Sequence, residues 1–160
     1  MWRGQRLQRD VILDTADRRL LAAGTALRVR ADGDRAFLTF KGPVVPGLVK
    51  AREEIETEAV SADALLAICA ALGFAPAFRY EKYREEFALP GVVIAVDDTP
   101  IGAFVEIEGD EGAIGTLAGR LGFSTADYVT ASYRALFVAS SGADGDARDM
   151  TFPPAPSRST

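Results

Sequence analysis

The chain has 160 residues, 48% of them hydrophobic and 26% charged, a length and mixture typical of one globular domain. Its net charge of −5 argues against a nucleic acid or an anionic membrane as partner, and the absence of histidine excludes Ser-His and Cys-His catalysis and histidine metal ligands. A single cysteine, Cys69, excludes an intramolecular disulfide and fits a reducing compartment, and no segment resembles a signal peptide or a membrane span, so we expect a cytoplasmic protein.

The first half of the chain alternates between apolar and charged residues in short segments, the pattern of strands whose successive side chains face opposite sides. Residues 15–24 interrupt the pattern with a turn of helical tendency. The sequence DGD at residues 32–34 indicates a hairpin turn. The expected strands of this half are residues 8–14, 26–31, 35–41 and 50–58.

The second half opens with a helix over residues 61–74, for which Ser61 is the expected N-cap. The apolar periodicity then returns to that of strands. The expected strands are residues 78–89, 91–98 and 101–109.

The end of the chain is expected to be helical and then disordered. One helix is predicted over residues 110–122 and another over 124–137, the latter opened by the capping-box pair Ser124 and Asp127. Residues 140–160 are rich in Ser, Gly, Asp and Pro and bury too little apolar surface to offset their ordering entropy, so we expect a disordered tail.

Nearly every expected strand is charged on one face and apolar on the other. Within residues 101–109, for example, Glu106 and Glu108 share one face. An open sheet with a solvated charged face is one interpretation. We favour a sheet curved into a barrel, with helices outside and charges inside, because the charges cluster by sign along the strands and the apolar faces need helices to cover them.

Such an interior would suit a polyanion and a divalent metal. Buried unpaired cations are costly, and arginine and lysine bind phosphate oxygens well. Neighbouring carboxylates repel each other unless a cation lies between them, and oxygen ligands without His or Cys suit Mg²⁺ or Mn²⁺. The expected phosphate-binding residues are Arg28, Arg30, Lys41, Arg52, Lys82 and Arg84, and the expected metal ligands are Asp97, Glu106 and Glu108.

Several short motifs between residue 8 and about residue 137 resemble, in order, those of the CYTH domain superfamily, which contains class IV (CyaB-type) adenylate cyclases and thiamine triphosphatases and is also called the triphosphate tunnel metalloenzymes. QRDVILDT is similar to Q-x-D-x-Y-F-D-T, LRVR to L-R-x-R, and LTFKGP to the family's lysine strand. KAREEIE is similar to K-x-R-x-E-x-E, EKYR to K-x-R, AVDD with GAFVEIE to L-D and G-x-F-x-E-I-E, and SYRALF to S-Y-x-x-L-L.

The resemblance implies an α+β fold in which an eight-stranded antiparallel tunnel, with helices packed outside, binds a triphosphate on its basic residues and a metal on its acidic ones. By the same resemblance Glu106, Glu108 and Lys82 are catalytic. The family's opening strand, E-x-E-x-K, has no counterpart in this sequence. We therefore expect seven of the eight strands, in a CYTH-like domain over residues 1–139 that is truncated at its N-terminus.

Two functions follow as alternatives. The first is a metal-dependent enzyme, either a cyclase that converts ATP to cyclic AMP and pyrophosphate or a hydrolase of ATP, thiamine triphosphate or inorganic triphosphate. The second is a catalytically inactive module that binds polyphosphate or nucleotide, because the E-x-E-x-K strand is missing. The sequence does not determine the oligomeric state, and a homodimer is one alternative.

Overall fold

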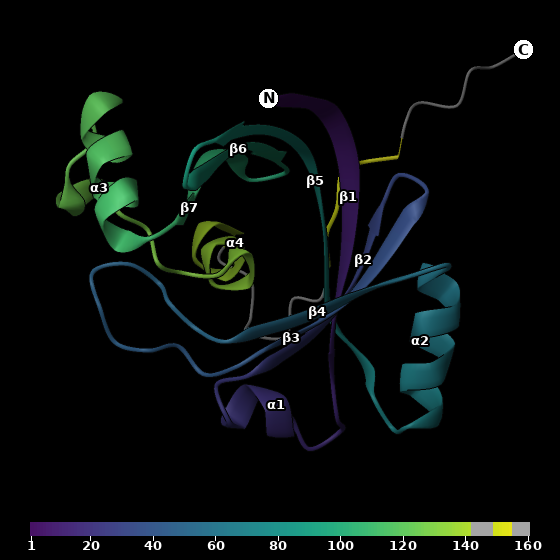
Figure 1. Ribbon diagram of the computed structural model, residues 1–160. Helices are drawn as coiled ribbons and strands as arrows, with labels where there is room; N and C mark the ends of the chain where they lie inside the picture. Colours follow the sequence, from purple (N-terminus) through teal and green to yellow (C-terminus); the bar gives the residue numbers. More distant parts are fainter. Residues whose placement is uncertain (142–148, 155–160) are drawn as a thin grey trace, which may run out of the picture.

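A computed structural model describes residues 1–141 and 149–154 of the chain. Its centre is a sheet with the strand order β4-β3-β2-β1-β5-β6-β7, antiparallel throughout, and a short β8 pairs with β5 in parallel (Figure 1). The strands are β1 (Trp2–Asp14), β2 (Ala26–Asp32), β3 (Arg35–Lys41), β4 (Glu54–Ala59), β5 (Ala75–Leu89), β6 (Val92–Thr99), β7 (Gly102–Gly109) and β8 (Asp149–Met150).

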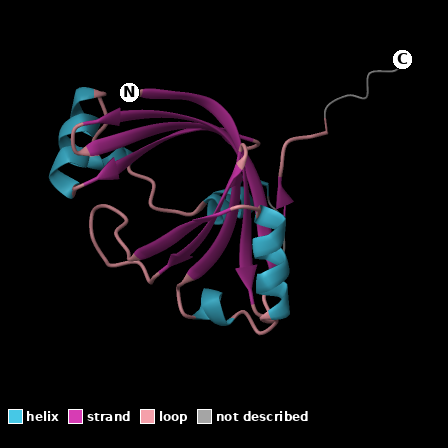
Figure 2. Ribbon diagram, turned by 45° about the vertical axis from the view of Figure 1, so that its right-hand side comes forward, coloured by secondary structure: helices cyan, strands magenta, loops and turns pink. Residues whose placement is uncertain are grey.

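The sheet bends around a common concave side and stays open along one edge. Figure 2 shows the strands curling in this way. Strands β4 and β7 stand at opposite ends of the strand order, and no pairing joins them within the described residues. The expected seven strands and the antiparallel, tunnel-like architecture are thus confirmed, with a wall that is open between β4 and β7.

Strand β1 lies in the middle of the sheet and is longer than expected. It pairs with β2 on one side and with β5 on the other. It begins at Trp2 rather than at residue 8, because its pairing with β5 continues across an irregularity at Gly4, whose φ of 72° suits glycine. Gln8 and Asp10 of this strand are each 1% exposed and occupy the interior of the molecule.

Four helices and one 3₁₀ turn complete the described chain: α1 (Arg19–Ala22), α2 (Ala62–Ala71), α3 (Glu111–Arg120), η1 (Thr125–Asp127) and α4 (Tyr133–Ser141). The expected caps are present, since Ser61 Oγ accepts a hydrogen bond from the backbone of Ala64. None of the described helices is long and apolar enough to cross a membrane.

Helix α2 covers the outer face of the first half of the sheet. Its Leu65 and Cys69 are buried in one cluster with Leu13 and Val29, which project from β1 and β2 away from the concave side. Burial raises the pKa of the Cys69 thiol, which fits a small core residue rather than a nucleophile. The charged faces of the same strands face the concave interior.

Helix α4 lies on the concave side instead, and it is shorter than the sequence predicts (Figure 1). The capping box at Ser124 and Asp127 forms but closes only a 3₁₀ turn. The chain is then extended at Tyr128, and the β-branched Val129 and Thr130 disfavour a helix, which restarts at Tyr133. The prediction of one helix over residues 124–137 is therefore wrong.

Part of the expected disordered tail is ordered. Asp149–Met150 forms β8, and the Met150 side chain is 1% exposed beside Phe78 and Tyr80. The ring of Phe152 packs on Tyr83, with 5.1 Å between centroids. The expectation of disorder does not hold at these residues, whereas residues 142–148 and 155–160 lie outside the described part of the chain.

Asp14, at the end of β1, holds the start of α1. Its carboxylate accepts hydrogen bonds from the backbone amides of Thr15 at 2.7 Å, Leu20 at 2.9 Å and Leu21 at 3.0 Å. Burial alone would raise the pKa of Asp14, but these backbone donors outweigh burial and lower it.

We expect Asp14→Asn to destabilise the protein by about 1–2 kcal/mol in urea unfolding, because one charged acceptor serves several backbone amides. Since the pKa of Asp14 is lowered on folding, its contribution is complete above about pH 4 and is lost as the pH falls through the folded-state pKa. The difference between variant and parent should therefore shrink at lower pH. Asp34→Asn, in the exposed hairpin turn, is the control; equal losses for both variants would contradict the role of Asp14.

Candidate active site

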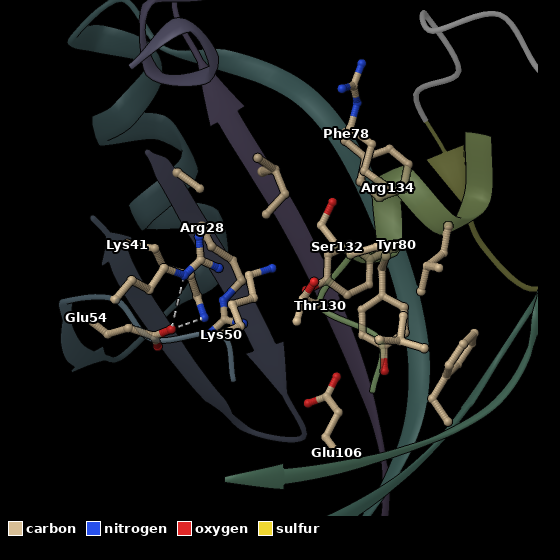
Figure 3. Close-up of a pocket in the computed structure, with 18 of the residues that line it drawn as sticks. Arg28, Lys41, Lys50, Glu54, Phe78, Tyr80, Glu106, Thr130, Ser132 and Arg134 are labelled. Carbon is tan, nitrogen blue, oxygen red and sulfur yellow. Dashed lines mark hydrogen bonds and ion pairs between the residues drawn. The ribbon is translucent and has the colours of Figure 1, made fainter. Parts of the chain in front are cut away.

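The concave side of the sheet encloses a cavity of about 1500 Å³. Residues of β1, β2, β3, β4, β5 and β7 line its walls, and the loop before β4 and residues 123–134 border it. Figure 3 shows Arg28, Lys41 and Lys50 gathered with Glu54 on one wall, and Glu106 across the space from them. The charged side chains that line the cavity are Asp14, Arg18, Arg28, Arg30, Lys41, Lys50, Arg52, Glu54, Glu56, Lys82, Arg84, Glu86, Glu106, Glu108, Asp127 and Arg134.

Strand alternation explains why these residues meet. Arg28 and Arg30 are two positions apart on β2, and Lys82 and Arg84 two apart on β5, so each pair projects from one face. Strand β1 lies between these two strands and brings both pairs to the same side of the sheet. All of the phosphate-binding residues predicted from the sequence line this cavity.

The cluster formed by β5, β6 and β7 is built around Asp97, which is fully buried. Arg84 donates to both of its oxygens, at 2.7 Å and 2.6 Å, and Lys82 Nζ donates at 2.8 Å. The hydroxyl of Tyr133 donates to Asp97 Oδ2 at 2.7 Å. Burial opposes ionisation of Asp97, but the hydrogen bond from Arg84 and the charge of Lys82 outweigh it and hold the pKa of Asp97 well below its usual range.

Asp97 does not line the cavity, in contrast to Glu106 and Glu108. It lies behind Lys82 and Arg84, and its oxygens already accept hydrogen bonds from cations. A metal ion at Asp97 would have to displace these donors, so this arrangement does not fit the role of metal ligand predicted from the sequence. Its geometry suits the orientation of Lys82 and Arg84 instead.

The same terminal nitrogens of Arg84 and Lys82 also reach carboxylates of β7. Arg84 Nη2 is hydrogen-bonded to Glu106 Oε2, and Arg84 Nη1 lies 3.8 Å from Glu108 Oε1. Lys82 Nζ is 3.9 Å from Glu106 Oε1. Burial lowers the pKa of Lys82 in spite of these carboxylates, whereas the hydrogen bond with Asp97 and the charge of Glu106 outweigh burial and raise the pKa of Arg84.

A second cluster joins β1, β2 and β3. Arg30 donates to both oxygens of Asp10, at 2.8 Å and 3.2 Å, and Arg28 Nε lies 3.4 Å from Asp10. Arg28 also donates to Thr39 Oγ1 at 3.1 Å, and its Nε is a buried donor without a hydrogen-bond partner in the described structure. Burial opposes the charge of Arg30, but Asp10 outweighs burial and raises the pKa of Arg30.

The third group lies near the open edge of the sheet. Lys41 Nζ donates to Glu54 Oε1 at 2.6 Å, and Arg52 Nε is 3.6 Å from the same carboxylate. Burial lowers the pKa values of Lys41 and Lys50, with neighbouring arginines adding to the effect. Burial opposes ionisation of Glu54, but the hydrogen bond from Lys41 outweighs it and lowers the pKa of Glu54.

Basic and acidic side chains are mixed within the cavity. Each cationic cluster contains carboxylates of its own, from Asp10, Glu54 and Asp97. Buried cations need counter-charges even when no anion is bound, and neighbouring strands supply them through the sheet register. A phosphate chain entering the cavity would compete with these carboxylates for the same donors.

Glu106 and Glu108 are the cavity residues that best fit a metal. They project from one face of β7, and their side chains are 33% and 64% exposed. In the described part of the chain no group of three or more acidic, Cys or His side chains is close enough to form a metal cage. Mg²⁺ is often held by one or two carboxylates together with substrate phosphates and water, and this donor set fits that pattern.

Several residues of the site were not among those singled out from the sequence. Asp10 is signalled by the strand alternation in QRDVILDT, and Lys50 by its place two residues before Arg52. Tyr133 stands in the SYRALF motif, but the sequence does not signal its contact with Asp97, because that contact joins α4 to a strand 36 residues earlier. The expected strand over 50–58 is shorter, because Ala51 bridges to Val45 and β4 begins at Glu54.

The fold and this charged interior define a class of protein, the antiparallel tunnel whose cavity carries both cations and carboxylates. The chain belongs to the CYTH domain family, whose sequence model matches residues 3–133. The family resemblance of the sequence motifs is therefore confirmed.

Similar proteins have been named or solved in several organisms. A protein of Methanocaldococcus jannaschii named as a candidate adenylate cyclase is 30% identical over 105 residues, which cover 65% of this chain and 60% of that protein. The matched stretch thus spans less than two thirds of that relative. The PH1012 protein of Pyrococcus horikoshii superimposes with a TM-score of 0.72 at 22% identity, with 82% of each chain covered.

A candidate adenylyl cyclase from Hippeastrum, whose structure is described with a dominant triphosphatase activity, superimposes with a TM-score of 0.68. It is 20% identical to this chain, and the match covers 86% of this chain and 83% of that one. At this identity the likeness supports the fold alone.

Proposed function

We propose that this protein is a divalent-metal-dependent enzyme that acts on triphosphates. The observation that carries the proposal is the convergence of Arg28, Arg30, Lys82 and Arg84 on one cavity that Glu106 and Glu108 also line. The family to which the chain belongs, and the name given to the relative in Methanocaldococcus jannaschii, support the same class of substrate.

In this proposal the cations bind the phosphate chain along the cavity. Arg28 and Arg30 approach it from β2, Lys82 and Arg84 from β5, and Lys41 and Arg52 from the open edge. Guanidinium groups suit the paired oxygens of a phosphate, and the lysines add compact charge. Because the cations stay ordered by internal carboxylates, the substrate meets a preorganised site.

Glu106 and Glu108 would hold Mg²⁺ or Mn²⁺ at the β7 wall. When bound there, the metal would neutralise phosphate charge and lower the pKa of an attacking oxygen nucleophile. Lys82, at the side of Glu106, would stabilise charge on the transferred or leaving phosphate. The attacking group is the ribose 3′-hydroxyl in a cyclase and a water molecule in a hydrolase.

The test offers purified protein tripolyphosphate, ATP and thiamine triphosphate, each with Mg²⁺, with Mn²⁺ and with EDTA. We expect metal-dependent turnover of at least one of them. Cyclic AMP with pyrophosphate would identify a cyclase, and orthophosphate a hydrolase. Calorimetric binding of tripolyphosphate without turnover would favour the inactive binding module, and absence of binding would contradict both functions.

Arg28→Ala should weaken tripolyphosphate binding about tenfold, because a charge-assisted contact with phosphate is lost. Isothermal titration calorimetry measures the change in Kd. Arg79→Ala is the matched control, since Arg79 is also on a strand but lies outside the cavity and pairs with Asp149 at 3.5 Å. An unchanged Kd for Arg28→Ala would remove this residue from the phosphate site.

A further inference from the structure

Tyr133 is the point at which α4 meets the charged cluster of the cavity. It is the first residue of α4, and its hydroxyl donates to Asp97 Oδ2 at 2.7 Å. It contributes this contact from the concave side, whereas Lys82 and Arg84 reach the same carboxylate from β5. The C-terminal helix is thereby joined to the residue that orients two of the proposed phosphate ligands.

The ring of Tyr133 is fixed by its neighbours. The edge of Phe104, from β7, packs against it with 5.5 Å between centroids, and Tyr80, from β5, lies at 5.6 Å. Lys82 Nζ lies 5.0 Å from the ring centroid, a cation–π geometry. Packing on several sides therefore sets the position of the hydroxyl.

The hydroxyl is a neutral donor. A tyrosine phenol, whose ordinary pKa is about 10, keeps its proton at neutral pH. A neutral donor on Asp97 Oδ2 fixes the carboxylate in the plane that Arg84 needs for its paired hydrogen bonds, without adding positive charge to the cluster.

We propose that Tyr133 is a positioning residue for triphosphate turnover: it fixes Asp97 and, through it, the direction in which Lys82 and Arg84 present their charges to the cavity. This inference rests on the proposed function. Tyr133 affects the rate of the chemical step more than substrate binding. Many cations share in binding the substrate, whereas stabilising the charge of the transition state needs cations that are correctly aligned.

The test is Tyr133→Phe, which keeps the ring, its packing and its cation–π contact and removes one hydroxyl. We expect kcat for the best triphosphate substrate to fall about tenfold, with KM changed less than twofold. Phe137→Leu is the control, because Phe137 belongs to the same helix as Tyr133 and has no polar group. Its ring packs on Phe78 of β5, at 6.1 Å between centroids. It should lower the thermal midpoint and leave kcat unchanged.

Assays are run well below the thermal midpoint of each variant, so that kcat refers to folded protein. Parental kcat in Tyr133→Phe would overturn the positioning role and leave the proposed function intact. Equal falls of kcat in Tyr133→Phe and Phe137→Leu would also overturn it, because the effect would then belong to α4 packing. If the unaltered protein turns over none of the triphosphates, the proposed function fails and this inference fails with it.

Discussion

Asp97→Asn is expected to destabilise the protein by about 3–5 kcal/mol, the largest effect on stability that we predict for a single change. Lys82 and Arg84 are 2% and 4% exposed, and both donate to the Asp97 carboxylate. The amide keeps the shape of the side chain and removes its charge, so it leaves buried cations without their main counter-charge. Urea unfolding followed by circular dichroism gives the free energy of unfolding.

Asp98→Asn is the matched control for this change. It is the next residue of β6, faces the opposite side of the strand and is exposed. Its replacement should alter the free energy of unfolding by less than about 0.5 kcal/mol. If Asp97→Asn costs no more than Asp98→Asn, Asp97 does not hold the cluster together.

Glu106→Ala is expected to lower kcat by at least about 100-fold while some affinity for tripolyphosphate remains. Glu106 is the carboxylate that both lines the cavity and contacts Arg84 and Lys82, so its loss removes a proposed metal ligand from the centre of the site. The basic residues of β2 and β3 are untouched, and phosphate binding should persist. Steady-state kinetics at saturating Mg²⁺ and calorimetry with tripolyphosphate measure the two effects.

Glu85→Ala provides the comparison for Glu106→Ala. Glu85 is also a strand glutamate, but it lies on the outer side of β5, where the Trp2 indole donates to it at 3.3 Å. Its loss should leave kcat unchanged. Full activity in Glu106→Ala would show that the proposed metal assignment is wrong. Loss of tripolyphosphate binding would show that Glu106 contributes to phosphate binding instead.

Most of the sheet could be predicted because alternation is a local property. In LRVR the spacing alone places Arg28 and Arg30 on one face and Leu27 on the other, and the structure has this arrangement. Helix α2 was predictable for a similar reason, since Ser61, the N-cap expected from the sequence, caps the helix in the structure. Each of these features depends on residues that are neighbours in the chain.

The features that the local sequence does not reveal depend on contacts between distant residues. The pairing of Asp97 opposite Arg84 is set by the register of β5 with β6. Met150 stands in a polar stretch, and its burial beside Tyr80 depends on the parallel pairing of β8 with β5. Neither pairing leaves a mark in the local sequence.

The sequence by itself determined the strands, the charged and apolar faces of each, and the family to which the chain belongs, because strand geometry converts spacing directly into direction. The tertiary structure alone decided which charges neutralise one another, how far the sheet wraps and where α4 lies. These depend on register and curvature, which bring Asp10, Asp97 and Tyr133 to cations far away in the chain. The energy of a buried charge is set by the partner it meets, and the fold supplies that partner.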